Sequence, residues 1–178
     1  MRRRTARTGY CAAAVLLALI GSTTTGCAGL ARLGLRILAP IIREAPGRNA
    51  TVTYAPPTSA SPLGSIVVRL WAEVENPNPI GLTLDRLEGT LFLDAVRAAE
   101  AVFPLGLPLR AGESDVVPLD VVVRLSDLPD LRRVVERAIA NRTLPYRLDG
   151  LVTVDARELG HPSFGPSTLL RGQLSVER

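Results

Sequence analysis

Hydrophobic and polar residues alternate with a period of two over most of the chain after residue 64. The clearest run begins at Ser65, where one face carries aliphatic side chains and the other carries mostly charged ones. The aliphatic row is Ile66, Val68, Leu70, Ala72 and Val74, and the opposite row is Val67, Arg69, Trp71, Glu73 and Glu75. This alternation predicts a half-buried antiparallel strand whose polar face points to water.

Later segments repeat the pattern and predict further strands at 82–93, 96–103, 117–125, 144–155 and 167–176. The strand at 82–93 is expected to bend near Asp85-Arg86, where the spacing of leucines shifts by one residue. Residues 96–103 fit a strand or a turn of helix, and their neighbour favours a strand. Prolines and glycines from Pro104 to Gly112 are expected to interrupt the sheet, and in the last strand Thr168 is expected to face inward.

One segment has the helical period instead. Between Leu128 and Asn141 the apolar residues follow a spacing of 3.6, Pro129 suits a first turn and Asn141 suits an exit. Residues 51–54 are expected to form a short first strand, and 55–64 a proline-rich loop. Six or seven short strands with one helix and no repeated strand–helix unit predict an all-β fold, an antiparallel β-sandwich, over residues 51–178.

The first 26 residues have the layout of an export signal: arginines, then an apolar run containing Cys11, then small residues ending at Gly26. The small residues before Cys27 resemble the lipobox of a bacterial lipoprotein signal, although Thr24 stands where leucine is usual. The resemblance implies cleavage before Cys27 and lipid on its thiol and amine, with the membrane as a partner. Ala28 after the cysteine resembles an outer-membrane address facing the periplasm. An uncleaved anchor, or an ordinary signal with an incidental cysteine, is the alternative.

Residues 27–50 are expected to be a tether. Within it, residues 28–42 have apolar positions at helical spacing, which fits an amphipathic helix lying on the membrane or a helix packed on the domain.

Charge and composition exclude several functions. The net charge of +4 is due to the leader, because removing its four arginines leaves 17 Arg against 17 Asp and Glu. A neutral surface lacks the field that nucleic-acid binding requires. With one histidine and two cysteines, no metal or other cofactor is expected. His161 with Asp155 and Ser163 or Ser167 has no nucleophile elbow, and paired carboxylates such as Glu73 and Glu75 suit solvated strand faces better than catalysis. We therefore expect no enzyme activity.

Asn76, Pro77, Asn78 and Pro79 are expected to form a stiff corner after the first long strand. Proline removes backbone donors, and asparagine side chains can replace the lost bonds to the backbone. We expect each asparagine to contribute about 1 kcal/mol through such bonds.

The strand that ends at Asn76 (VRLWAEVEN), the NPNP motif and the following IGLTLDRLEGTLFL resemble the type-2 late embryogenesis abundant family, also called the water-stress and hypersensitive-response domain. The helix and the later LPYRLDG segment fit the same family, so the resemblance covers residues 51–177. It implies an immunoglobulin- or fibronectin-like sandwich with one helix, a structural role for NPNP and no catalytic residues. Bacterial members are often exported lipoproteins, and plant members are linked to desiccation and defence.

These observations leave three classes of function. The favoured class is a lipid-anchored envelope domain that binds or protects under water or osmotic stress. The second is an assembly module that docks to an envelope protein. The third is a carrier of a lipid or another apolar ligand.

Overall fold

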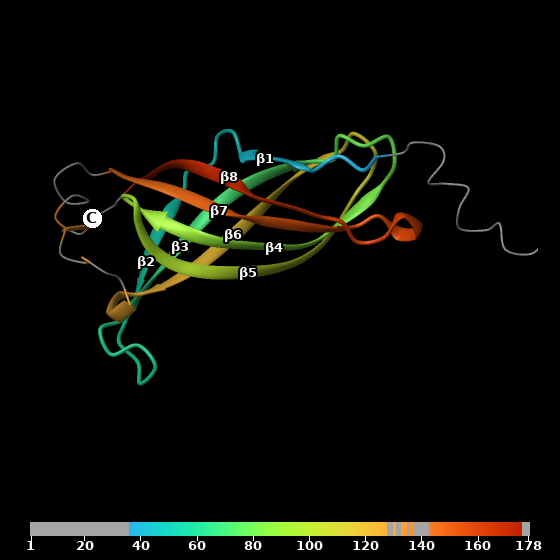
Figure 1. Ribbon diagram of the computed structural model, residues 1–178. Coiled ribbons are helices and arrows are strands. Elements are labelled where there is room, and N and C mark those ends of the chain that lie inside the picture. Colours follow the sequence, from blue (N-terminus) through green and yellow to red (C-terminus); the bar gives the residue numbers. More distant parts are fainter. Residues whose placement is uncertain (1–35, 128–129, 131–132, 135, 137–142, 176–178) are drawn as a thin grey trace, which may run out of the picture. The chain divides into compact units, whose positions relative to one another are not determined.

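The computed structural model describes residues 36–127, 130, 133–134, 136 and 143–175, and its strands form two antiparallel sheets packed as a sandwich (Figure 1). The strands are β1 (Ile41–Glu44), β2 (Thr51–Ala55), β3 (Ser65–Glu75), β4 (Leu82–Leu93), β5 (Val96–Leu109), β6 (Ser114–Arg124), β7 (Thr143–Asp155) and β8 (Ser163–Ser175). Two single turns of 3-10 helix, Leu125–Asp127 and Arg157–Leu159, follow β6 and β7. The predicted β-sandwich is confirmed.

The first sheet is built around β3. Strand β6 pairs with its whole length on one side, from Ser65 opposite Arg124 to Glu75 opposite Ser114. On the other side β1 and β2 pair with different halves of β3. The second sheet has the order β5-β4-β7-β8. The edges of the first sheet are therefore β6 on one side and β1 with β2 on the other.

The register of β4 contains the bend that the leucine spacing predicts. Pairing with both β5 and β7 shifts between Leu84 and Arg86, because an extra residue is accommodated there. Leu84 and Leu87 on either side of the shift are both fully buried. A bulge thus keeps one row of leucines facing the core although their spacing in the sequence changes.

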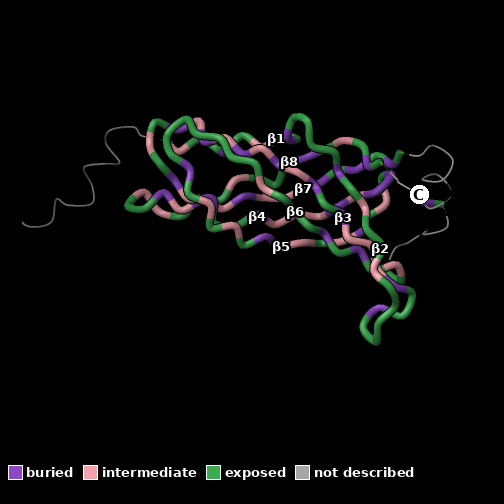
Figure 2. Tube along the Cα trace, turned by 180° about the vertical axis from the view of Figure 1, so that it is seen from behind, coloured by how far each residue is buried: buried purple, intermediate pink, exposed green. Residues whose placement is uncertain are grey.

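Leucine and valine from both sheets form one buried core between the layers. Figure 2 marks the buried residues along the strands in purple. The fully buried side chains include Val68, Leu70, Leu91, Leu119 and Leu148. At about 25 cal/mol for each Å² of apolar surface removed from water, such side chains contribute roughly 1.5–3 kcal/mol each. With few aromatic residues, branched aliphatic side chains form the core.

Strand β5 is longer than the sequence predicts. It continues through Pro104, Gly106 and Pro108 to Leu109, where we expect an interruption. The prolines are tolerated because β5 is an edge strand that pairs only with β4 among the described strands. A proline that faces an unpaired edge removes no ladder bond.

The segment before β2 also differs from the expectation. Residues 36–40 are not helical, and Ile41–Glu44 forms β1 against Ala72–Glu75, so the predicted helix over 28–42 is wrong for the described residues. Helical spacing of apolar residues misled here because a four-residue strand is too short to show a period of two. Part of the range assigned to the tether therefore belongs to the sandwich.

The predicted helix over 128–141 lies mostly outside the described residues. Arg133, Val134 and Glu136 have helical backbone, and Val134 is buried in the core with its amide donating to the Asp130 carbonyl oxygen at 3.2 Å. In β8, Thr168 is exposed and Leu169 and Leu170 are both buried, because register shifts against β7 displace the predicted alternation.

Candidate functional site

The NPNP corner lies between β3 and β4 and is centred on a fully buried asparagine. The Asn76 side-chain amide donates to the carbonyl oxygens of Ile80 at 2.8 Å, Arg110 at 2.9 Å and Leu109 at 3.3 Å. Its Oδ1 accepts from the backbone amide and the side-chain amide of Asn78, both at 3.0 Å. One side chain therefore joins the start of β4 to the end of β5.

Asn78 extends this network to the N-terminal end of the domain. Its side chain is 2% exposed, and its Oδ1 accepts from the Leu38 amide at 2.7 Å while its Nδ2 donates to the Leu38 carbonyl oxygen at 3.0 Å. The Asn78 side chain thus bonds both backbone groups of Leu38, as a residue of a neighbouring strand would. It holds the chain just ahead of β1 although the two residues are 40 positions apart in sequence.

The backbone of the same corner completes the junction. The Asn76 amide donates to the Glu113 carbonyl oxygen at 2.9 Å, and the Gly112 amide donates to the Asn76 carbonyl oxygen at 3.0 Å. Pro77 is half-buried and Pro79 is exposed. The four motif residues therefore form a hydrogen-bonded junction of β3, β4, the β5–β6 turn and the segment before β1, and it offers no exposed reactive group.

The side of the sandwich formed by β1, β2 and β8 is closed. Ala50 forms a parallel bridge with Leu174 of β8. The Tyr146 hydroxyl of β7 donates to the Glu44 carboxylate of β1, so a side-chain bond joins the two sheets. Gly172 of β8 leaves room for this carboxylate, since a Cβ there would lie 2.0 Å from Glu44 Oε1.

The Tyr146–Glu44 bond predicts an alkaline loss of stability. Burial, and then the bond to Glu44, raise the pKa of Tyr146. The folded domain keeps the Tyr146 phenol neutral, whereas in the unfolded chain it ionises near pH 10. The contribution of Tyr146 to the free energy of unfolding is therefore constant below about pH 10 and falls above it by about 1.4 kcal/mol per pH unit. Tyr146→Phe should be about 1 kcal/mol less stable at pH 7 and lose this slope.

Urea unfolding between pH 8 and 11.5 measures the effect. Tyr54, which is 59% exposed, supplies the matched control, because Tyr54→Phe should keep the slope of the wild type. A Tyr146→Phe protein that loses stability above pH 10 as steeply as the wild type would contradict the assignment.

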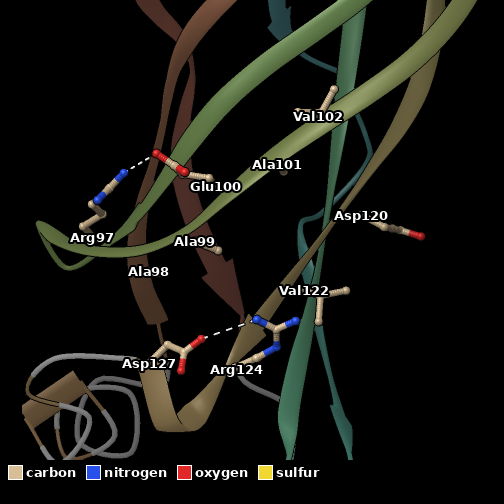
Figure 3. A pocket seen from close by; sticks show the side chains of 10 residues that line it. All are labelled: Arg97, Ala98, Ala99, Glu100, Ala101, Val102, Asp120, Val122, Arg124 and Asp127. Atoms are coloured by element: carbon tan, nitrogen blue, oxygen red, sulfur yellow. Dashed lines mark hydrogen bonds and ion pairs between the residues drawn. The ribbon is translucent and has the colours of Figure 1, made fainter. Parts of the chain in front are cut away.

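The opposite side of the sandwich is open. A cleft of about 690 Å³ lies between residues 97–102 of β5 and residues 120–127 of β6 and the turn after it (Figure 3). Val102 on one wall and Val122 on the other are each 57% exposed. The cleft thus combines two unpaired strand edges with exposed apolar side chains.

The charges that line this cleft are balanced. Arg97 pairs with Glu100, and Arg124 lies 3.7 Å from Asp127. Asp120 receives two bonds of 2.7 Å from the Arg69 guanidinium of β3. These hydrogen bonds, more than the charge itself, lower the pKa of the Asp120 carboxyl, so it is ionised at neutral pH. The balance favours an uncharged or self-complementary occupant over a polyanion or polycation.

A second, smaller hollow of about 430 Å³ lies over β4, β5 and β7. Its floor includes Gly89 and Gly150, which are directly opposite each other in the ladder. Beside it, the Arg147 guanidinium lies 4.6 Å from the centre of the Phe92 ring, while Arg147 also bonds Asp149.

The ionisable residues singled out in the sequence do not converge on a reaction centre. His161 Nδ1 lies 3.9 Å from Asp155 Oδ1, but the Ser163 hydroxyl is bonded to Thr153 at 2.9 Å. Glu73 and Glu75 both bind Arg43 of β1. Within the described ranges, no group of three or more His, Cys, Asp or Glu residues could hold a metal ion.

Cys27 and the export signal over residues 1–26 lie outside the described residues. Among the residues that are described, no helix is long and apolar enough to cross a bilayer.

Sequence reasoning did not find the Tyr146–Glu44 bond, the partner of Glu73 and Glu75, or the cleft. The first two depend on β1, a strand too short to predict from its pattern. The cleft depends on how the edges of two sheets lie in space, which no local pattern encodes. In the sequence, Val102 and Val122 are ordinary members of alternating runs, and nothing there indicates that they are exposed.

Three comparisons with known proteins extend these observations. The type-2 family model of late embryogenesis abundant proteins matches residues 72–167. A protein from Arabidopsis thaliana solved in solution is 16% identical with a TM-score of 0.52, covering 75% of this chain and 83% of its own. A solution structure described as a late embryogenesis abundant protein is 18% identical, with a TM-score of 0.46 over 83% of this chain and 75% of its own. A crystal structure from Archaeoglobus fulgidus is 14% identical, with a TM-score of 0.43 over 74% of this chain and 98% of its own. No curated protein sequence matches the chain.

Proposed function

Because this chain belongs to the type-2 late embryogenesis abundant family, we propose that it is a non-catalytic, lipid-anchored envelope protein that binds or protects under water or osmotic stress. The family match over more than half of the chain carries the proposal, since this family is generally non-enzymatic. The resemblance drawn from the sequence motifs is confirmed by that match. The lipid anchor, the stress role and the envelope location are the parts that experiments must test.

The anchor follows from the sequence around Cys27. Two or more acyl chains hold a protein on a membrane stably, because each buried CH₂ contributes about 0.8 kcal/mol. Ile37, where the compact domain begins, lies ten positions after Cys27, so the chain between them spans at most about 36 Å when fully extended. The domain would therefore work close to the bilayer surface.

Cys27→Ser should abolish acylation and move the protein from the membrane to the soluble fraction. Labelling with a radioactive fatty acid, followed by fractionation of washed envelopes, measures both. Cys11→Ser is the matched control, because Cys11 lies in the apolar run expected to be removed. Unchanged membrane partitioning of the Cys27→Ser protein would refute the anchor.

Survival of a deletion strain tests the stress role. We expect reduced survival after drying or osmotic upshift, restored by the wild-type gene and not by Cys27→Ser. Equal survival of deletion and parent strains would count against the role while leaving the anchor to the labelling experiment.

A second candidate function, docking to an envelope protein complex, is favoured by the open cleft between β5 and β6. Affinity capture of the full chain from intact envelopes, with protein and lipid analysis of the eluate, separates the functions. A stoichiometric protein would support docking, and a bound lipid or other apolar molecule would support a carrier. If the eluate contained neither a partner protein nor an apolar molecule, the protective role would be favoured.

A further inference from the structure

The C-terminal half of β6 has backbone groups that face away from the first sheet. The Trp71 carbonyl accepts from the Ala45 amide on the β1 side, and the Leu125 amide donates to the Gly64 carbonyl on the β3 side. Because a residue's N–H and C=O point to the same edge of a strand, the odd-numbered residues of β6 face β3. Asp120, Val122 and Arg124 therefore direct their backbone donors and acceptors to the free edge.

This edge has a self-complementary sequence. Residues 120–124 read DVVVR, so a second copy running antiparallel would place Val122 opposite Val122 and Asp120 opposite Arg124 in both directions. The three outward residues would form hydrogen-bonded pairs, and opposite charges directly across strands are favourable. Asp120 would then lie between Arg69 of its own chain and Arg124 of the second copy.

We propose that the edge from Leu119 to Arg124 is an association surface for a second copy of this chain, in an antiparallel strand-to-strand dimer with Val122 on the two-fold axis. Such an interface is isologous, because the same patch serves both subunits. The inference rests on the β6 edge and the cleft beside it, and it is independent of the lipid anchor and the stress role.

The β5 edge and the first half of the β6 edge carry features that prevent such pairing. Strand β5 has Pro104, Gly106 and Pro108, and Pro118 interrupts the donors of the first half of β6. The Val116 amide is occupied by the Asp115 carboxylate at 2.7 Å. Charged side chains are a common protection of a strand edge, and like charges there repel a second copy. The stretch after Pro118 has instead one acid and one base, four residues apart, which attract it.

The cleft supplies the space that the second strand needs. It is open beside Asp120, Val122 and Arg124, and Figure 3 shows these residues on one wall with Ala99, Ala101 and Val102 on the other. Across the first sheet, Val67 of β3 lies next to Val122. The dimer would cover the exposed Val122 side chain and join the Val67–Val122 row of each copy into one apolar stripe.

Charge reversal provides the test. Asp120→Arg places arginine opposite arginine in a homodimer, and Arg124→Asp places aspartate opposite aspartate. Each variant of the full chain, purified in mild detergent, should self-associate about 100-fold more weakly than the wild type, because like charges across an interface are strongly unfavourable. Mixed with different affinity tags, the two variants should co-purify one to one, because the mixed pair restores both charge pairs.

Cysteine cross-linking provides an independent measurement in intact cells that express the full chain. Paired Cα atoms at a hydrogen-bonded position lie about 5.5 Å apart, within the range a disulfide spans. Val122→Cys should give a covalent dimer on mild oxidation, whereas Val116→Cys, an exposed valine before Pro118, should not exceed the wild-type background from the native cysteines. A monomeric wild type at high concentration, or equal cross-linking of the two variants, would overturn the proposal. Folded charge variants that each dimerise like the wild type would also overturn it.

Discussion

Asn76→Ala should lower the free energy of unfolding by about 3–5 kcal/mol, because several buried polar groups lose their partners together. The Leu109 carbonyl and the Asn78 amide are buried and bond to this side chain. Each unsatisfied buried group costs about 1–3 kcal/mol, which exceeds the 1 kcal/mol expected from the sequence alone. Chemical denaturation of the wild type and the variant at equal pH measures the difference.

Asn49→Ala is the control for that experiment. Asn49 is exposed in the turn between β1 and β2, so its replacement should change stability by less than about 0.5 kcal/mol. The stability loss of Asn78→Ala should lie between those of Asn49→Ala and Asn76→Ala. The substitution removes the bonds to Leu38, but the Asn76 side-chain amide keeps its bonds to Ile80 and to Leu109 of β5. If Asn76→Ala stayed within 1 kcal/mol of the wild type, water would have to replace the side chain in the junction.

Gly150→Ala should destabilise the second sheet by at least about 3 kcal/mol, since the collision is with backbone and not with a movable side chain. A Cβ at this position would lie 1.9 Å from the Glu88 carbonyl oxygen and 2.7 Å from the Gly89 Cα. Relief requires separating β4 from β7 at the centre of the sheet. For a domain of this size the thermal midpoint should fall by roughly 10 °C.

Gly81→Ala is the matched control, at the residue just before β4 of the same sheet. Its added Cβ would make only ordinary contacts, the nearest at 3.5 Å from the Leu109 carbonyl oxygen. The variant should be as stable as the wild type or slightly more stable, because alanine restricts the unfolded chain. A Gly150→Ala midpoint equal to that of Gly81→Ala would mean that β4 and β7 separate at no cost.

Strands with long alternating runs were predictable from the sequence, because burial on one face imposes the period of two. The row from Val68 to Val74 and the bend in β4 are as expected. The exceptions have physical reasons. Strand β1 is only four residues long, β5 keeps its prolines on a free edge, and a register shift in β8 buries two consecutive leucines.

The candidate site was predictable only in part. The NPNP motif identified the corner, since its prolines and asparagines have fixed conformational and hydrogen-bonding preferences. Its partners Leu38 and Arg110 are distant in sequence, and the contacts exist only once both sheets have formed. The self-complementarity of residues 120–124 was present in the sequence, but it has meaning only because β6 is an edge.

The first strand is fastened at two points, by Asn78 at Leu38 and by Tyr146 at Glu44, and its four residues from Ile41 to Glu44 pair with β3. A force that pulls on the chain at Ile37 would load the Leu38–Asn78 bonds first and the Glu44–Tyr146 bond after them. A pull sufficient to detach β1 would leave β2–β8 paired, because β2 pairs with a separate half of β3. Detachment of β1 under load would thus lengthen the chain ahead of β2 while the rest of the sandwich stays folded.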